Sequence, residues 1–216
     1  MTAAHGPAFP CAPPRLQVVH FDDVPAQPWR NGGGVTRELA AWPNATDWQL
    51  RLSVADIERD GPFSAFPGIA RWFVVLSGDG VRLDHSGQQI DLRPGDNPHA
   101  FDGGEPPGCT LLGGATRDLN LMLKAPASGR LWPADAPWQA EAGQRTLRWR
   151  GLFCAEACTL LTPADTLALP AMSLAWQAAG WADESTVGQD PAALTEGWQL
   201  KPAVRPPRAW WIALEN

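Results

Sequence analysis

The sequence predicts an all-β protein, and three observations lead to this expectation. The chain of 216 residues contains 21 glycines and 22 prolines, about a fifth of its residues where about 12% is usual. Short apolar or alternating runs recur between these turn-forming residues. No regular exchange of strand runs with longer helical runs appears, as a parallel α/β sheet would require. Short antiparallel strands joined by tight turns therefore fit the sequence best.

The expected strands follow one another along the chain. In the clearest run, residues 48–54, apolar side chains alternate with Gln49, Arg51 and Ser53, so the two sets face opposite sides of a strand. Strands this closely spaced are typical of a β-sandwich or β-barrel. The runs expected to form strands are 16–21, 35–41, 48–54, 71–76, 81–85, 89–92, 109–112, 118–124, 146–153, 159–161, 166–169, 172–176 and 210–214.

Turn residues divide the first half in the order of a cupin barrel, a small antiparallel jelly roll with a pocket in its mouth. A buried-type strand runs into a turn with Gly78 and Gly80, and the following hairpin ends in the turn at 94–96. The second half is long enough for a more degenerate barrel. We therefore predict a bicupin of two antiparallel jelly-roll-like β-barrels. Its parts are a disordered N-terminal extension (1–14), an N-terminal cupin-like barrel (15–128) and a C-terminal degenerate cupin-like barrel (129–216).

Charge and hydropathy exclude several classes of partner. The net charge is −6 and no basic stripe occurs, so we expect no nucleic-acid partner. No apolar run approaches the 18 residues typical of a membrane helix, so we expect no membrane partner. Residues 1–14 lack the basic start and apolar stretch of a secretory signal. These features lead us to expect a cytoplasmic protein.

Metal and nucleophile chemistry are not predicted. A metal-binding cupin needs two histidines one residue apart on a strand, and no such pair occurs. His85 and His99 each follow one of the turns and can approach each other, but a third ligand is missing. Cys154 and Cys158 lack the second ligand pair of a zinc site, so we read them as free thiols. We predict no metal, no cofactor and no catalytic residue.

The stretch Trp-Arg-Asn-Gly-Gly-Gly-Val-Thr-Arg-Glu at 29–38 is the most unusual in the chain. It lacks the lysine and the spacing of a phosphate-binding loop. Two readings stay open. The glycines form an ordinary turn with positive φ, or they form one wall of a binding site where another group approaches the backbone closely.

Several stretches together resemble the HutD/Ves family of cupin-like proteins. The matching stretches are 29–38, 51–57, 61–68, 71–80, 101–103 and 118–122. They cover residues 21–124 in the family's order. The family usually carries an acidic residue just before Arg71, where this chain has Ala70. The resemblance implies a bicupin without metal-binding histidines, associated with histidine utilisation and with no firmly attached catalytic activity.

The matched polar and aromatic residues predict a pocket for a small acidic metabolite. Guanidinium groups suit carboxylates, and aromatic side chains can supply apolar walls. The resemblance points to formiminoglutamate, formylglutamate or urocanate. The predicted ligand-binding residues are Trp29, Arg30, Asn31, Gly32, Gly33, Thr36, Glu38, Arg51, Ser53, Phe63, Asp118 and Asn120.

Structural alternatives stand beside these roles. Arg51 and Glu38 can simply form a salt bridge, Asn120 can satisfy a buried backbone group, and Trp29 can belong to the core or to a lid.

Three functions remain open at this stage. The first is a non-enzymatic sensor or modulator of histidine utilisation, and the second is a metal-independent enzyme on a similar substrate. An unpaired Glu38 or Asp118 in the pocket would favour the enzyme, because a general base must reach its proton. The third is a protein-interaction module with exposed tryptophans. Edge strands of small barrels commonly pair, so a homodimer is also possible.

Overall fold

The computed structural model describes residues 15–139, 146–179, 194 and 197–215, and the predicted extension at 1–14 lies outside them. The first part of the chain forms β1 (Gln17–His20), the 3-10 helix η1 (Phe21–Asp23), β2 (Gln27–Pro28), β3 (Gly34–Trp42), β4 (Leu50–Ile57), β5 (Gly61–Pro62), β6 (Ile69–Ser77), β7 (Val81–His85), β8 (Gln88–Leu92), β9 (His99–Asp102), β10 (Gly108–Leu111) and β11 (Thr116–Lys124). The second part forms β12 (Ser128–Pro133), β13 (Leu147–Cys154), β14 (Cys158–Leu161), β15 (Thr166–Leu169), β16 (Ser173–Ala178), β17 (Gln199–Leu200) and β18 (Ala209–Glu215).

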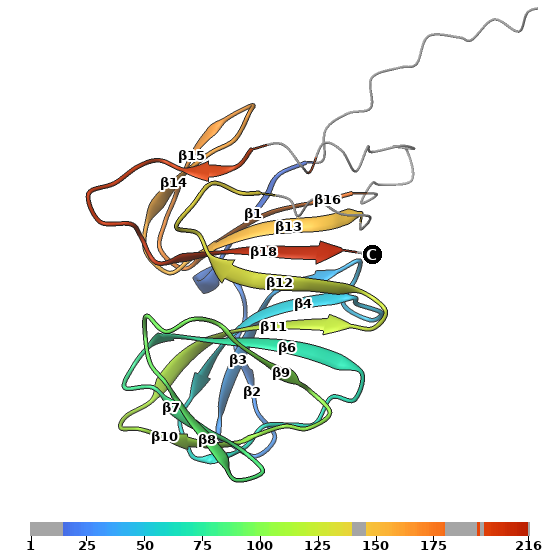
Figure 1. The fold of residues 1–216 in the computed structure, drawn as a ribbon, viewed down its shortest axis with the longest axis vertical. Coiled ribbons are helices and arrows are strands. Elements are labelled where there is room, and N and C mark those ends of the chain that lie inside the picture. Colours follow the sequence, from blue (N-terminus) through green and yellow to red (C-terminus); the bar gives the residue numbers. More distant parts are fainter. Residues whose placement is uncertain (1–14, 140–145, 180–193, 195–196, 216) are drawn as a thin grey trace, which may run out of the picture.

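The all-β prediction is confirmed. A six-stranded sheet, β2-β3-β4-β11-β6-β9, and a four-stranded sheet, β5-β10-β7-β8, form one lobe (Figure 1). A five-stranded sheet, β1-β16-β13-β18-β12, and a three-stranded sheet, β15-β14-β17, form the other. Two closed jelly-roll barrels are not confirmed, because the hydrogen-bonded ladders of the described strands do not close. Within the same residues, no helix is long and apolar enough to cross a membrane.

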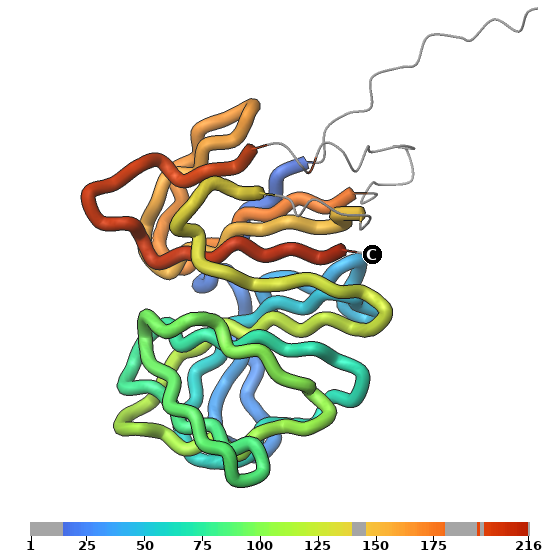
Figure 2. Tube along the Cα trace, in the orientation of Figure 1, coloured from blue at the N-terminus to red at the C-terminus, as the bar shows by residue number. Residues whose placement is uncertain are grey.

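The first strand crosses between the two lobes. β1 pairs with β16 over Gln17↔Trp176 to His20↔Ser173, although its sequence position lies within the expected first unit of 15–128. In Figure 2 the blue start of the described chain runs beside the orange strands of the second lobe. The chain therefore enters the first lobe only after its first strand has joined the second.

The six-stranded sheet is covered on both faces. Leu52 of β4 and Leu121 of β11 lie opposite each other in register and pack in one apolar cluster with second-lobe residues such as Trp149 and Ile212. Side chains point alternately to the two faces of a strand. Arg51 and Ser53 therefore point inward, away from this cluster and into the first lobe.

The interior of the second lobe is filled by large side chains. Trp138, Trp198 and Trp211 are buried and pack in one cluster with Leu152. The buried Arg150 guanidinium lies 4.3 Å from the Trp198 ring centroid. Tryptophan side chains thus fill the space between the sheets of the second lobe, whereas the corresponding space in the first lobe contains a cavity.

We expect Leu121→Ala to lower the free energy of unfolding by about 2–5 kcal/mol, because it leaves a void between the two lobes. Leu121 is fully buried. Urea denaturation followed by tryptophan fluorescence measures the change. Val18→Ala on β1 is the control, since Val18 is 48% exposed and its truncation should alter stability by less than about 0.5 kcal/mol. Equal effects of the two substitutions would contradict the two-sided burial of the sheet.

Candidate functional site

A cavity of about 700 Å³ lies between the inner face of the six-stranded sheet and two loops of the first lobe. Nine of the twelve predicted site residues line it: Trp29, Arg30, Asn31, Thr36, Arg51, Ser53, Phe63, Asp118 and Asn120. Gly32, Gly33 and Glu38 lie outside its wall. The structure thus gathers most of the predicted set in one place, and ligand binding by that set stays a prediction.

Arg71 of β6 is the most unusual group in the cavity wall. Its side chain is buried, its Nε donates to Asn120 Oδ1 at 3.4 Å, and its Nη1 has no hydrogen-bond partner among the described residues. The guanidinium carbon lies 4.9 Å and 5.2 Å from the ring centroids of Phe101 and Phe63. Burial lowers the pKa of Arg71 to about 10, so it stays charged at neutral pH. A buried cation with an unused donor is suited to receive an anion.

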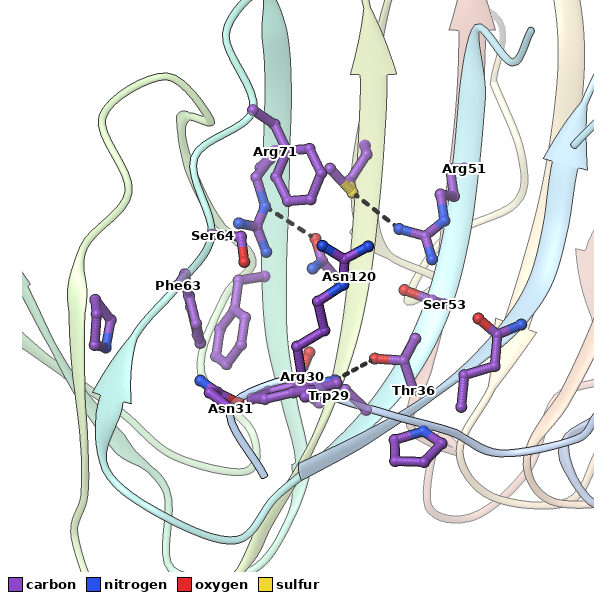
Figure 3. Close-up of a pocket in the computed structure, with 18 residues that line it drawn as sticks. Trp29, Arg30, Asn31, Thr36, Arg51, Ser53, Phe63, Ser64, Arg71 and Asn120 are labelled. Carbon is purple, nitrogen blue, oxygen red and sulfur yellow. Dashed lines mark hydrogen bonds between the residues drawn. The ribbon is translucent and has the colours of Figure 1, made fainter. Parts of the chain in front are cut away.

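Arg51 and Glu38 form the salt bridge that the sequence left open. Arg51 Nε donates to Glu38 Oε2 at 2.5 Å, and its Nη1 lies 3.9 Å from Met122 Sδ. Figure 3 shows Arg30, Arg51 and Arg71 pointing toward one another around Asn120. Glu38 is thereby held outside the cavity, while the three guanidinium groups give it an excess of positive charge.

Asp118 of β11 is the cavity's buried carboxyl group. It is 2% exposed and lines the cavity, and no ion pair or hydrogen bond from the described residues reaches its side chain. Burial raises the pKa of Asp118 well above its ordinary value; the charge of Arg71 opposes this and that of Asp56 adds to it. Burial, with the charge of Asp118, also raises the pKa of the nearby Cys109 thiol to about 12. The Cys109 thiol is therefore neutral at physiological pH, and burial favours the neutral form of Asp118.

The glycine-rich segment forms both a turn and a cavity wall. Trp29 Nε1 donates to Thr36 Oγ1 at 2.7 Å, and the Gly33 amide donates to Asn31 Oδ1 at 3.0 Å. Gly32 has a φ of +66°, which favours glycine. A Cβ at Gly34 would lie 2.1 Å from the Asp56 carbonyl oxygen. The half-buried Trp29 ring is thus fixed as a wall by a backbone that only glycine permits.

His85 and His99 contact each other outside this cavity. His85 and His99 place their Nε2 atoms 3.0 Å apart beside a small cleft of about 210 Å³. His85 ends β7, and His99 starts β9. Burial, with the charge of His85, lowers the pKa of His99. Among the described residues, no group of three or more potential metal ligands gathers.

Sequence reasoning overlooked Arg71 as a site residue, together with several apolar wall residues. Arg71 opens a run that reads as fully buried, and it stands two positions before Phe73 on the same strand face. This alternation places a charged residue at an inward-facing position of the strand, and that was the signal by which the sequence could have identified Arg71. The overlooked lining residues are Gln27, Pro28, Ala55, Pro62, Ser64, Arg71, Phe73 and Met122, while Phe66 lines the cavity as one of the expected aromatic walls.

Comparison with known proteins places the chain in a family. The HutD family model matches residues 21–188. This chain belongs to the HutD family. Its fold is cupin-like, as in HutD from Pseudomonas fluorescens SBW25, which is 24% identical with a TM-score of 0.70 and covers 94% of this chain and 100% of that one.

Other similar proteins match over different lengths. A conserved protein of unknown function from Pseudomonas aeruginosa PAO1 is 29% identical with a TM-score of 0.71, covering 93% of this chain and 98% of that one. An uncharacterised 21.2 kDa protein in the hutC 3′ region of Pseudomonas putida is 45% identical over 111 residues, 50% of this chain and 58% of that protein. Protein Ves of Citrobacter koseri is 37% identical over 109 residues, 49% of this chain and 57% of its own length. The chain thus spans little more than half the length of the curated relatives it matches.

We expect Gly34→Ala to destabilise the protein by more than about 1 kcal/mol, because the new methyl group overlaps the Asp56 carbonyl and must displace β4. Gly61→Ala is the matched control, since no atom lies within 4 Å of its added Cβ. Thermal unfolding of both variants measures the difference. Similar unfolding temperatures for the two variants would show that the backbone approach at Gly34 is unimportant.

We expect Asp118→Asn to change how stability depends on pH. The pKa of Asp118 is higher in the folded than in the unfolded chain, so its contribution to stability is lost as pH rises from about 4 through the folded-state pKa. The asparagine variant lacks this loss, and at pH 8 it should exceed the wild type by about 1–3 kcal/mol. Urea denaturation across pH 4–8 measures the profiles. Asp47 is exposed, so Asp47→Asn should retain the wild-type profile, whereas parallel curves for Asp118→Asn and wild type would refute a raised pKa of Asp118.

Proposed function

We propose that this protein binds a small acidic metabolite of histidine utilisation in the first-lobe cavity, as a non-enzymatic sensor or modulator. The observation that carries the proposal is the buried Arg71, whose Nη1 faces no protein acceptor among the described residues. A ligand carboxylate would supply that acceptor. Charge-assisted hydrogen bonds to a buried guanidinium are stronger than neutral ones.

The remaining wall suits an organic acid. Arg30 and Arg51 add positive charge, Asn120 adds an amide, and Phe63 and Trp29 add apolar surface. A cavity of this size that combines aromatic walls with converging polar groups suits a small organic ligand. Formiminoglutamate, formylglutamate and urocanate each combine a carboxylate with a nitrogen-containing group that such a wall can hold.

The names of relatives support the assignment to a pathway. The Pseudomonas putida relative is described by its position in the hutC 3′ region, and the Pseudomonas fluorescens protein is named HutD. Neither name specifies a ligand, so the choice of metabolite rests on the family resemblance, and the chemistry of the cavity supports it. The description of the chain as two cupin-like units, 15–128 and 129–216, belongs to the same proposal, with the second unit filled by tryptophan and the first left open for the ligand.

One observation favours a metal-independent enzyme as the second candidate. Glu38 is held by Arg51, but Asp118 lies in the cavity without a partner among the described residues. A free carboxyl group in a substrate pocket can transfer protons. The interaction-module alternative loses support, because every tryptophan that the structure describes is buried or half-buried.

Thermal-shift measurements with the three named metabolites test the proposal. A ligand at 100 times its dissociation constant adds about 2.7 kcal/mol of stability, which raises the unfolding temperature of a chain this size by several degrees. We expect such a shift in the wild type and its loss in Arg71→Met. Arg82→Met is the control, because Arg82 is exposed and pairs with Asp91 on another sheet. The absence of a shift with all three metabolites in folded wild-type protein would overturn the proposal.

A further inference from the structure

The two sheets of the first lobe are not joined by backbone hydrogen bonds where β8 and β9 end them. Among the described strands, β8 is the last of the four-stranded sheet and β9 the last of the six-stranded sheet, and no ladder connects the two (Figure 1). His85, at the end of β7, and His99, at the start of β9, place their Nε2 atoms 3.0 Å apart. The two imidazoles therefore form a polar contact from one sheet to the other at this seam.

The residues around the two imidazoles fix their orientation and leave them accessible. His85 and His99 are half-buried. The Phe101 ring stacks on His99 with a centroid distance of 5.9 Å and meets His85 edge-on at 5.5 Å. Phe101 also lies 4.9 Å from the guanidinium carbon of Arg71, so one aromatic ring stands between the histidines and the larger cavity. The small cleft of about 210 Å³ beside the histidines is lined by His85, Gln88, Ile90, His99, Ala100 and Phe101.

The distance between the two nitrogens matches that of two ligands on one metal ion. Imidazole nitrogens bind zinc and similar divalent cations at about 2.0–2.1 Å. Two such bonds at a right angle place the nitrogens about 2.8–3.0 Å apart, whereas a tetrahedral angle places them about 3.3–3.4 Å apart. The observed 3.0 Å fits the right angle. Right angles between neighbouring ligands are typical of nickel(II) and copper(II), and zinc(II) prefers a tetrahedron.

The protonation of the pair is compatible with metal binding. Without an ion, one Nε2–H donates to the lone pair of the other Nε2. Burial, with the charge of His85, lowers the pKa of His99, so the His99 imidazole is neutral at neutral pH, which is the form that binds metals. A shift of the shared proton to the Nδ1 atom of its own ring would leave two Nε2 lone pairs for one ion, with no net release of a proton.

Other ligands can complete the coordination shell. The sequence predicts no metal because a third histidine or a carboxylate is missing, but nitrogen and oxygen ligands are combined in tetragonal sites. Gln88 stands directly opposite His85 in the β7–β8 hairpin and lines the same cleft. Its side-chain amide oxygen is an acceptor, and water can fill the remaining positions.

We propose that His85 and His99 bind one tetragonal divalent cation, nickel(II) or copper(II), as neighbouring imidazole ligands at the seam between β8 and β9. The bound ion would join the two sheets of the first lobe where no described ladder does, and it would stabilise the folded chain by binding to it alone. This site lies outside the arginine-lined cavity and does not depend on the function proposed for that cavity.

Isothermal titration calorimetry with nickel(II) near pH 7 tests the site on the full chain. Nickel(II) is the probe because copper(II) is reduced by free thiols such as that of Cys158. We expect one tightly bound ion per wild-type chain. His85→Gln and His99→Gln should each weaken this binding at least about tenfold, since each removes a ligand. His20→Gln is the control, because His20 is also half-buried but lies 3.8 Å from Asp22, outside this cleft, and its affinity should equal that of the wild type.

Thermal unfolding provides a second readout. Nickel(II) in large excess over its dissociation constant should raise the unfolding temperature of the wild type by several degrees. His85→Gln and His99→Gln should show no such rise. Unfolding curves without nickel show that each variant is folded, and either variant alone is sufficient for the comparison. Zinc(II) should bind the wild type more weakly than nickel(II), because the two imidazoles are too close for a tetrahedron.

The remaining outcomes would each overturn the site. Absence of nickel binding to the folded wild type, or binding that neither substitution weakens, would show that the 3.0 Å contact is a hydrogen bond only. An equal loss of affinity in His20→Gln would place the ion elsewhere. Tighter binding of zinc(II) at the same two histidines would contradict the tetragonal geometry. None of these results bears on the cavity, which the measurements with metabolites test separately.

Discussion

The burial of the six-stranded sheet on both faces is the constraint on which the rest of the structure depends. Its outward side chains, among them Leu52 and Leu121, form one core with the second lobe. Its inward side chains include Arg51, Ser53 and Asn120, which line the cavity. Because strand side chains alternate strictly, a register slip of one residue would exchange the two sets. The large apolar face therefore fixes the orientation of the polar one, and the site is positioned by packing that takes place on the opposite side of the sheet.

The two lobes share this plan but differ in what fills them. In the second lobe, Trp198 and Trp211 occupy the interior between the sheets, and the buried Arg150 lies against the Trp198 ring. In the first lobe, Ser53 and Ala55 stand at inward positions of β4. Small inward residues leave room beside the sheet, and large ones remove it. The second lobe then acts mainly as a support whose packing holds the six-stranded sheet in place.

Much of the strand content could be predicted from local patterns, because alternation and turn residues are local signals. The run at 48–54 and the turns at Gly78 and Gly80 correspond to observed elements. The two-residue strands β2 and β5 are too short to show a period. Strand β12 contains one glycine and ends in a proline, residues that are typical of a break between strands. The pairing of β1 with β16 joins residues more than 150 positions apart, and no local pattern specifies such a partner.

The candidate site, too, could be predicted from the sequence only in part. The segment at 29–38 and the residues on β4 and β11 were identified by their unusual sequence and by resemblance to a family, and the structure brings most of them to one cavity. Arg71 was not singled out, because a charged residue at the start of an apolar run resembles a strand end. Only its position opposite Met122 and beside three aromatic rings shows that its guanidinium is buried. Burial is a property of the packed structure, and a single strand's sequence does not contain it.

The cavity keeps Arg71 and Asp118 at a cost to stability. A buried polar group without a partner is destabilising by about 1–3 kcal/mol, and both Arg71 Nη1 and the Asp118 carboxyl lack one among the described residues. An apolar residue at either position would pack without that penalty. A molecule that satisfies both groups would recover the cost on binding, and this recovery is a source of affinity that an already satisfied wall does not offer. The polar groups that weaken the empty fold are therefore the ones best placed to select what fills it.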